Sequence, residues 1–109
     1  MKAKKWIGIN MKKSYFIAHI IEENGVHKIQ RYLRNQGGIE EFMKEVDMET
    51  IVGVDKTPWT FGFLQSIKYA IKDYIILDKK DLMAFAQILD EKEKAEAEEL
   101  ALIIQRSNF

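Results

Sequence analysis

The chain has 109 residues, of which 47% are hydrophobic and 31% are charged, and it contains no cysteine. This length and composition are typical of one soluble globular domain. The absence of cysteine excludes disulfides, thiolate-bound zinc and cysteine nucleophiles, and the net charge of zero argues against a general polyanion binder. No run approaches the about 20 apolar residues of a membrane span, and the apolar run of the basic start is too short for a signal peptide. We therefore expect one cytoplasmic domain over residues 1–109, without membrane contact.

The charges are unevenly distributed along the chain. Residues 1–36 hold eight Lys or Arg and two acids, a net charge of +6, whereas residues 37–109 hold nine bases and fifteen acids, a net charge of −6. This asymmetry fits a basic strand face beside an acidic helical surface. It also fits a domain whose charges are simply solvated, so the pattern leaves both arrangements open.

Three strands are predicted in the first third of the chain. Residues 5–10, KWIGIN, form a short apolar run, and residues 14–21 alternate from one face to the other as a half-buried strand does. The pair Asn24-Gly25 follows, and it predicts a two-residue type I′ turn because both residues accept a positive φ. Residues 26–33 then form the third strand of an antiparallel meander.

Helices and strands alternate after the third strand. Apolar residues at i, i+3, i+4 and i+7 over residues 39–46 predict a helix. The run IVGVD, residues 51–55, predicts a strand, and Thr57 as N-cap with Pro58 at the first helical position predicts a helix directly after it. The run YIILD, residues 74–78, predicts a fifth strand, and further helical segments follow, the last over about residues 90–107.

The resulting order, βββαβαβα, predicts an α/β fold with a five-stranded mixed sheet. The runs IVGVD and YIILD are almost wholly apolar, as strands covered on both faces are. Right-handed crossovers make these two strands parallel to the first strand. The predicted sheet order is 3-2-1-4-5, with strand 2 antiparallel to its neighbours.

Small polar residues close the strands at the centre of this sheet. Asn10 ends the first strand and Asp55 ends the fourth, at the switch point where ligands of open α/β sheets gather. Asp78 ends the fifth strand, although it also suits a helix cap. Glu93 and Glu96 of the last helix share one face because they are three residues apart. Oxygen ligands of this kind suit Mg²⁺ or Mn²⁺, whereas a Glu/Lys/Ala run is also typical of a solvated helix.

The predicted order resembles the ribonuclease H-like fold, and four fragments are similar to the N-terminal RuvC-like domain of DEDD transposases and pilin-gene invertases. Gly8-Ile9-Asn10, with Lys13 three positions on, is similar to the family's Gly-Ile-Asp strand followed by a lysine. Residues 55–59, DKTPW, stand in the place of its Glu-Ala-Thr-Gly and aromatic segment. Residues 92–101, KEKAEAEELA, keep the spacing and the Ala…Leu-Ala framework of its Thr-Asp-x-x-Asp-Ala-x-x-Leu-Ala pattern.

The resemblance implies a metal-dependent nuclease domain of a DNA recombinase. Its catalytic and metal-binding tetrad would be Asn10, Asp55, Glu93 and Glu96, holding Mg²⁺ or Mn²⁺, and its partners would be DNA and a guide RNA. The chain departs from the family at these positions. The amide of Asn10 cannot bridge two dications, two glutamates replace aspartates, and the family's second domain with its nucleophilic serine has no counterpart here. The implied site is therefore degenerate.

Further residues are candidates for contact with nucleic acid. Lys12, Lys13 and Lys56 could meet phosphates, and Trp59 could stack on a base, although solvated turns and ordinary packing explain these residues too. His19 and His27 lack the spacing of metal ligands, and strand polarity explains them.

Three functions remain open on the sequence alone. The first is the metal-dependent nuclease, and the second is a non-catalytic domain of the same fold that binds nucleic acid or protein. The third is an actin-like ATPase, which needs glycine in the first hairpin turn, where this chain has residues 10–13, NMKK. An apolar seam of the last helix fits two arrangements: it closes the core, or it pairs with a second copy as a short coiled coil and forms a homodimer. The residues of that seam are Ala97, Leu100, Ala101 and Ile104.

Overall fold

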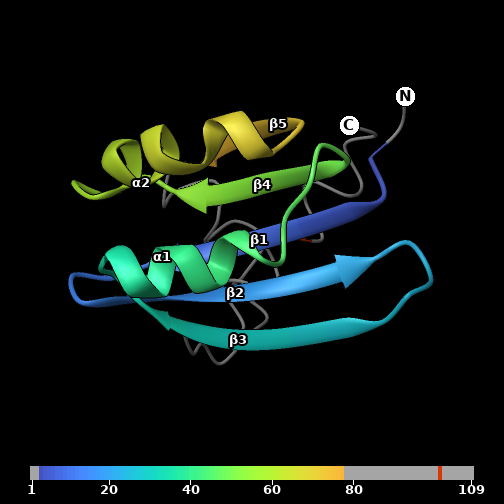
Figure 1. Cartoon of the computed structure of the whole chain (residues 1–109), viewed down its shortest axis with the longest axis horizontal. Helices are drawn as coiled ribbons and strands as arrows, with labels where there is room; N and C mark the ends of the chain where they lie inside the picture. The colour runs from blue at the N-terminus through green and yellow to red at the C-terminus, as the bar shows by residue number, and fades with distance from the viewer. Residues whose placement is uncertain (1–2, 78–100, 102–109) are drawn as a thin grey trace.

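The computed structural model describes residues 3–77 and residue 101. Within them, a five-stranded sheet of order β3-β2-β1-β4-β5 carries two α-helices (Figure 1). The predicted α/β class and the predicted strand order are therefore confirmed. The elements are β1 (Lys5–Met11), β2 (Tyr15–Glu22), β3 (His27–Leu33), α1 (Gln36–Met43), β4 (Thr50–Asp55), α2 (Thr60–Ile67), the 3₁₀ turn η1 (Lys68–Ala70) and β5 (Asp73–Leu77).

The strand directions follow from the connections between the strands. Short turns make β1, β2 and β3 antiparallel neighbours, whereas α1 and α2 carry the chain back so that β4 and β5 run parallel to β1. The carboxyl ends of β1, β4 and β5 consequently meet at one edge of the sheet.

The core lies between the sheet and the two helices. Phe16 of β2 is fully buried at its centre, and its ring contacts Tyr32 of β3 at 5.3 Å, Phe42 of α1 at 5.5 Å and Phe63 of α2 at 4.9 Å between ring centroids. Aromatic pairs of this kind add about 0.5–1.5 kcal/mol each beyond the apolar area they bury. This cluster therefore holds both helices on the same face of the sheet.

The second face of the three central strands, β2, β1 and β4, is also largely buried. Because side chains alternate along a strand, the residues next to the core positions of β1, β2 and β4 point away from α1 and α2. The buried residues on this second face include Asn10, Ile17, His19, Ile21, Ile51 and Asp55. A sheet buried on both faces agrees with the nearly continuous apolar runs of β1 and β4.

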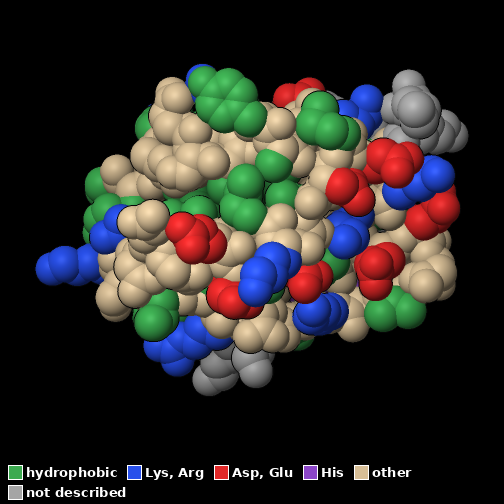
Figure 2. All heavy atoms as spheres, viewed as in Figure 1, with side chains coloured by type: hydrophobic (Ala, Val, Ile, Leu, Met, Phe, Trp, Pro, Cys, Tyr) green, Lys and Arg blue, Asp and Glu red, His purple; other side chains and the backbone are tan. Residues whose placement is uncertain are grey.

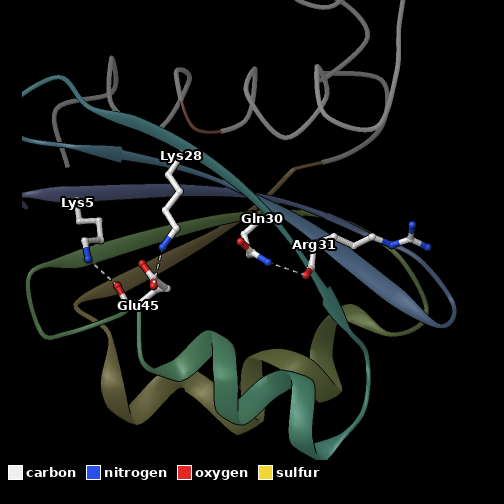
Figure 3. Close-up of polar contacts among 5 residues, drawn as sticks. All are labelled: Lys5, Lys28, Gln30, Arg31 and Glu45. Carbon is white, nitrogen blue, oxygen red and sulfur yellow. Dashed lines mark hydrogen bonds and ion pairs between the residues drawn. The ribbon is translucent and has the colours of Figure 1, made fainter.

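The segment after α1 is tied to the sheet by Glu45. Its carboxylate accepts a hydrogen bond from Lys28 Nζ of β3 at 2.9 Å, and its backbone oxygen accepts one from Lys5 Nζ of β1 at 2.7 Å (Figure 3). Val46 packs against the core although α1 has ended at Met43. The predicted apolar stripe thus reaches the core, but its last member lies beyond the helix.

The β2–β3 hairpin differs from the predicted two-residue turn. Gly25 N–H donates to Glu22 O at 2.9 Å and Glu22 N–H donates to Val26 O at 3.0 Å, so the loop has three residues, Glu23 to Gly25. Gly25 has a φ of 88°, as the last residue of a three-residue hairpin loop requires. The type I′ prediction was wrong because glycine also serves this longer loop.

Several predicted residues lie outside the described part of the chain. They include Asp78, Glu93, Glu96 and most of the last helix, while Ala101 is helical and fully buried. Among the described residues, no helix has the length and apolar character needed to cross a membrane.

Candidate nucleic-acid interface at the strand ends

Asn10 and Asp55 lie at the carboxyl ends of the two central parallel strands. Ile9 of β1 is in register with Val54 of β4, and the residues that follow them, Asn10 and Asp55, both point to the face opposite α1 and α2. Asn10 is 1% exposed and Asp55 is 6% exposed. The structure therefore brings these two predicted site residues to the same end and face of the sheet.

The carboxylate of Asp55 connects the two strands. Its Oδ1 accepts a hydrogen bond from Met11 N–H at 2.9 Å, and this bond is buried. A hydrogen bond to an ionised carboxylate is roughly twice as strong as a bond between neutral groups. Asp55 consequently holds the end of β1 against the end of β4, which is a structural role that the sequence did not reveal.

The turn after Asp55 is closed by two threonine hydroxyls. Thr60 Oγ1 donates to Asp55 O at 2.6 Å and accepts from Thr57 N–H at 3.0 Å. Because the hydroxyl hydrogen of Thr60 is used in the bond to Asp55, the 2.8 Å contact between the two hydroxyls has Thr57 as its donor. We call Asp55, Thr57 and Thr60 the threonine clasp.

The clasp explains why the predicted start of α2 was wrong. Thr57 Oγ1 accepts from Trp59 N–H at 3.2 Å, but Pro58 and Trp59 form a turn and the helix begins only at Thr60. The hydroxyl of Thr60 is bound back to β4, so the chain completes a turn before it enters the helix. Thr57 therefore caps this turn and is not the N-cap of α2.

Four basic residues surround this end of the sheet. Lys12 and Lys13 lie in the β1–β2 turn, Arg34 lies between β3 and α1, and Lys56 directly follows β4. We call these four residues the basic rim. Figure 2 shows Lys and Arg side chains projecting from the end of the molecule where β1 turns into β2. Lys13 and Lys56 are exposed, and within residues 3–77 no ion pair is formed by Lys12, Lys13 or Lys56.

Trp59 positions a cation at this rim. Its ring packs partly against the core, and the guanidinium carbon of Arg34 lies 5.4 Å from the ring centroid. Arg34 Nε also donates to the backbone oxygen of Lys13. Arg34 is thereby held between the β1–β2 turn and the β4–α2 turn. Sequence reasoning missed Arg34 because no motif or spacing marks it.

The described residues supply only part of a metal site. Asn10 and Asp55 offer one amide and one carboxylate, and no group of three His, Asp or Glu that could hold an ion occurs within the described part of the chain. One negative charge is too little for a pair of dications, and Glu93 and Glu96 lie outside these residues. The other predicted contacts, Lys12, Lys13, Lys56 and Trp59, do gather at this end of the sheet.

Comparison with known proteins gives no further assignment. No protein-family model matches the chain, and no curated protein matches it.

Proposed function

We propose that this chain is a ribonuclease H-like domain, similar to the N-terminal domain of DEDD transposases and pilin-gene invertases, that binds nucleic acid through the basic rim without cleaving it. The strand order, with β2 antiparallel and β4 and β5 parallel to β1, supports the fold assignment. The observation that carries the function is the meeting of Lys12, Lys13, Arg34 and Lys56 around one sheet edge.

Nucleic-acid binding is favoured by the positions of the four basic side chains of the rim and by the ordering of Arg34. Phosphate contacts by Lys and Arg release counterions and supply most of the affinity for nucleic acid. Three connections far apart in the sequence bring the rim residues together, so the rim exists only in the folded chain. Arg34 is already ordered by Trp59 and Lys13, which lowers the entropy it loses when it binds a phosphate.

Absence of cleavage is supported by the strand-end pair. A two-metal mechanism needs carboxylates that share and neutralise two dications. Asn10 is neutral at the first of these positions, and Asp55 Oδ1 is bound to Met11 N–H. The pair therefore serves better as a joint between β1 and β4 than as a metal centre.

The test compares two double variants with the same change in charge. Lys12→Glu/Lys13→Glu alters the rim, whereas Lys68→Glu/Lys72→Glu alters two exposed lysines in and just after η1, before β5. Fluorescence anisotropy with single-stranded and duplex DNA should show binding by the wild type. The rim variant should bind DNA about tenfold more weakly or worse. The slope of log K against log salt concentration should become less steep by the amount that two phosphate contacts contribute. If both variants lost DNA affinity equally, the effect would come from the total charge of the protein and not from the position of the basic rim.

A metal-dependent nuclease is the second candidate, because Asn10 and Asp55 lie side by side. Asn10→Asp places two buried carboxylates together, so this variant should lose stability without metal and regain it with Mn²⁺. We expect no cleavage of single-stranded or branched DNA by the wild type. If the wild type cleaved DNA in Mn²⁺ and Asp55→Asn did not, the chain would be a nuclease and the proposal of binding without cleavage would be wrong.

A further inference from the structure

Two histidines meet across the β2–β3 hairpin, away from the strand-end site. His19 Nε2 lies 2.9 Å from His27 Nδ1, and the rings are perpendicular, with an angle of 89° and centroids 5.0 Å apart. His19 is 2% exposed whereas His27 is exposed. The strand register pairs His19 with Ile29 and Ile21 with His27, so the histidines are diagonal neighbours on the second face of the sheet.

The contact fixes which ring nitrogens of the two histidines face each other. A neutral imidazole has one N–H donor and one nitrogen lone pair. The hydrogen bond between His19 and His27 therefore uses the N–H of one ring and the lone pair of the other. Two ring nitrogens from different strands therefore face each other across a single hydrogen.

The separation of these nitrogens matches that of two ligands on one metal ion. Metal–nitrogen bonds of about 2.0–2.1 Å at a right angle place two nitrogens about 2.9 Å apart, whereas a tetrahedral angle needs about 3.4 Å. Right angles belong to square-planar and octahedral coordination, which Cu²⁺ and Ni²⁺ adopt with nitrogen ligands. Neutral imidazole is also the commonest side-chain ligand of such ions.

We propose that His19 and His27 bind one divalent transition-metal ion, Cu²⁺ most tightly and Ni²⁺ next. The ion replaces the hydrogen bond between the rings. Because two bonds of about 2.0–2.1 Å do not fit along a 2.9 Å line, the ion lies to one side of that line and both rings turn their lone pairs towards it. The hydrogen moves to the other nitrogen of the ring that carried it. Both rings then coordinate as neutral ligands, and no net proton is lost. Among the described residues no third His, Asp or Glu joins the pair, so water completes the coordination sphere.

His19 and His27 are eight positions apart, so this ligand pair could not be recognised from its spacing in the sequence. Ligand pairs on one helix or in one loop lie about three to six positions apart, whereas His19 and His27 meet only through the strand register. The chain holds two histidines and no cysteine. Any imidazole signal from a bound ion therefore comes from this pair alone.

The test is a Cu²⁺ titration followed by continuous-wave and pulsed electron paramagnetic resonance. The wild type should bind one ion with the remote nitrogens of two imidazoles coupled to it. His27→Ala should lose one imidazole and bind about tenfold more weakly or worse. Gln30→Ala is the matched control, because this exposed β3 side chain bonds only to the neighbouring Arg31 oxygen among the contacts of the described residues (Figure 3), and it should match the wild type.

A second measurement guards against a folding defect. Excess Ni²⁺ should raise the melting temperature of the wild type and of Gln30→Ala, because it binds only the folded site, and should raise that of His27→Ala clearly less. In EDTA, Gln30→Ala should melt as the wild type does, whereas His27→Ala should melt lower because the buried His19 loses its hydrogen-bond partner. The shift caused by the metal is therefore measured within each protein, against its own melting temperature in EDTA. Cu²⁺ spectra without imidazole coupling in the wild type, or coupling that is the same in His27→Ala, would overturn the proposal.

Discussion

Gly38 lies where the first turn of α1 passes the end of β3. Asn35 caps this turn, since its Oδ1 accepts from Gly38 N–H at 2.8 Å. A Cβ atom on Gly38 would overlap the backbone carbonyl of Leu33. Backbone cannot rotate out of the way as a side chain can, so the glycine is required by the close approach of the helix to the strand.

We therefore expect Gly38→Ala to destabilise the fold by about 1–3 kcal/mol or more, because the carbonyl of Leu33 or the helix must shift. Gly37→Ala is the matched control. Its Cβ would meet only Asn35 Oδ1, at 3.7 Å, and alanine favours a helix over glycine by about 0.5–1 kcal/mol. Urea denaturation of both variants gives the comparison. Equal stability of the two variants would show that the approach at Gly38 is looser than described.

Tyr32 gives the fold a dependence on alkaline pH. Burial, and then the charges of Glu45 and Glu41, raise the pKa of Tyr32 from 10.0 to about 12. Between these values the unfolded chain releases the phenolic proton while the folded chain retains it. The folded state then binds more protons than the unfolded state. The free energy of unfolding therefore keeps its full value below about pH 10 and falls as the pH rises towards 12.

This prediction is checked by urea denaturation at about pH 9 and about pH 11. The wild type should lose stability between the two conditions, and Tyr32→Phe should lose less because it has no phenol to ionise. Tyr69→Phe, at an 80% exposed position, should behave as the wild type does. If Tyr32→Phe and the wild type lost equal stability, the alkaline effect would have to come from other groups.

At the scale of elements, the threonine clasp fixes how α2 leaves β4. Thr60 is fully buried, and its hydroxyl both donates to Asp55 O and accepts from Thr57. Replacing it by an isosteric methyl removes the buried hydrogen bond to Asp55 O and the two part-buried hydrogen bonds to Thr57. An unsatisfied buried donor or acceptor costs about 1–3 kcal/mol.

Thr60→Val should accordingly lower the free energy of unfolding by at least about 1–3 kcal/mol. Ser66→Ala also removes a hydroxyl from α2, but that hydroxyl is exposed and bonds to Gly62 O at 3.3 Å, so its loss should stay within about 0.5 kcal/mol. Chemical denaturation measures both. A Thr60→Val protein as stable as Ser66→Ala would show that the clasp contributes little.

The strands were more predictable than the turns for a physical reason. Apolar runs such as IVGVD predict a strand from local sequence alone, and the right-handed crossover rule then predicts the order of the strands in the sheet. The length of the β2–β3 loop depends instead on cross-strand register, and Gly25 serves loops of two or three residues equally well. The start of α2 likewise depends on the bond from Thr60 to Asp55, which no local pattern shows.

At the scale of the whole molecule, the sheet makes a site out of residues distant in sequence. The meeting of Asn10 and Asp55 could be predicted, because parallel neighbours deliver their last residues to one edge. The bond from Met11 to Asp55 and the seating of Arg34 on Trp59 could not, since both depend on side-chain geometry across elements. The proposed function therefore depends on this edge of the sheet acting as a binding surface.

The most direct test is a titration of ¹⁵N-labelled protein with a short single-stranded DNA, followed by amide chemical shifts. Binding through the basic rim predicts the largest shifts around residues 12–14, Arg34 and residues 56–59, at the carboxyl ends of β1 and β4. The opposite end of the sheet, around Glu23–Gly25 and Asp47–Glu49, should be unaffected. Shifts confined to that opposite end, or no shifts in DNA excess at low salt, would contradict the account.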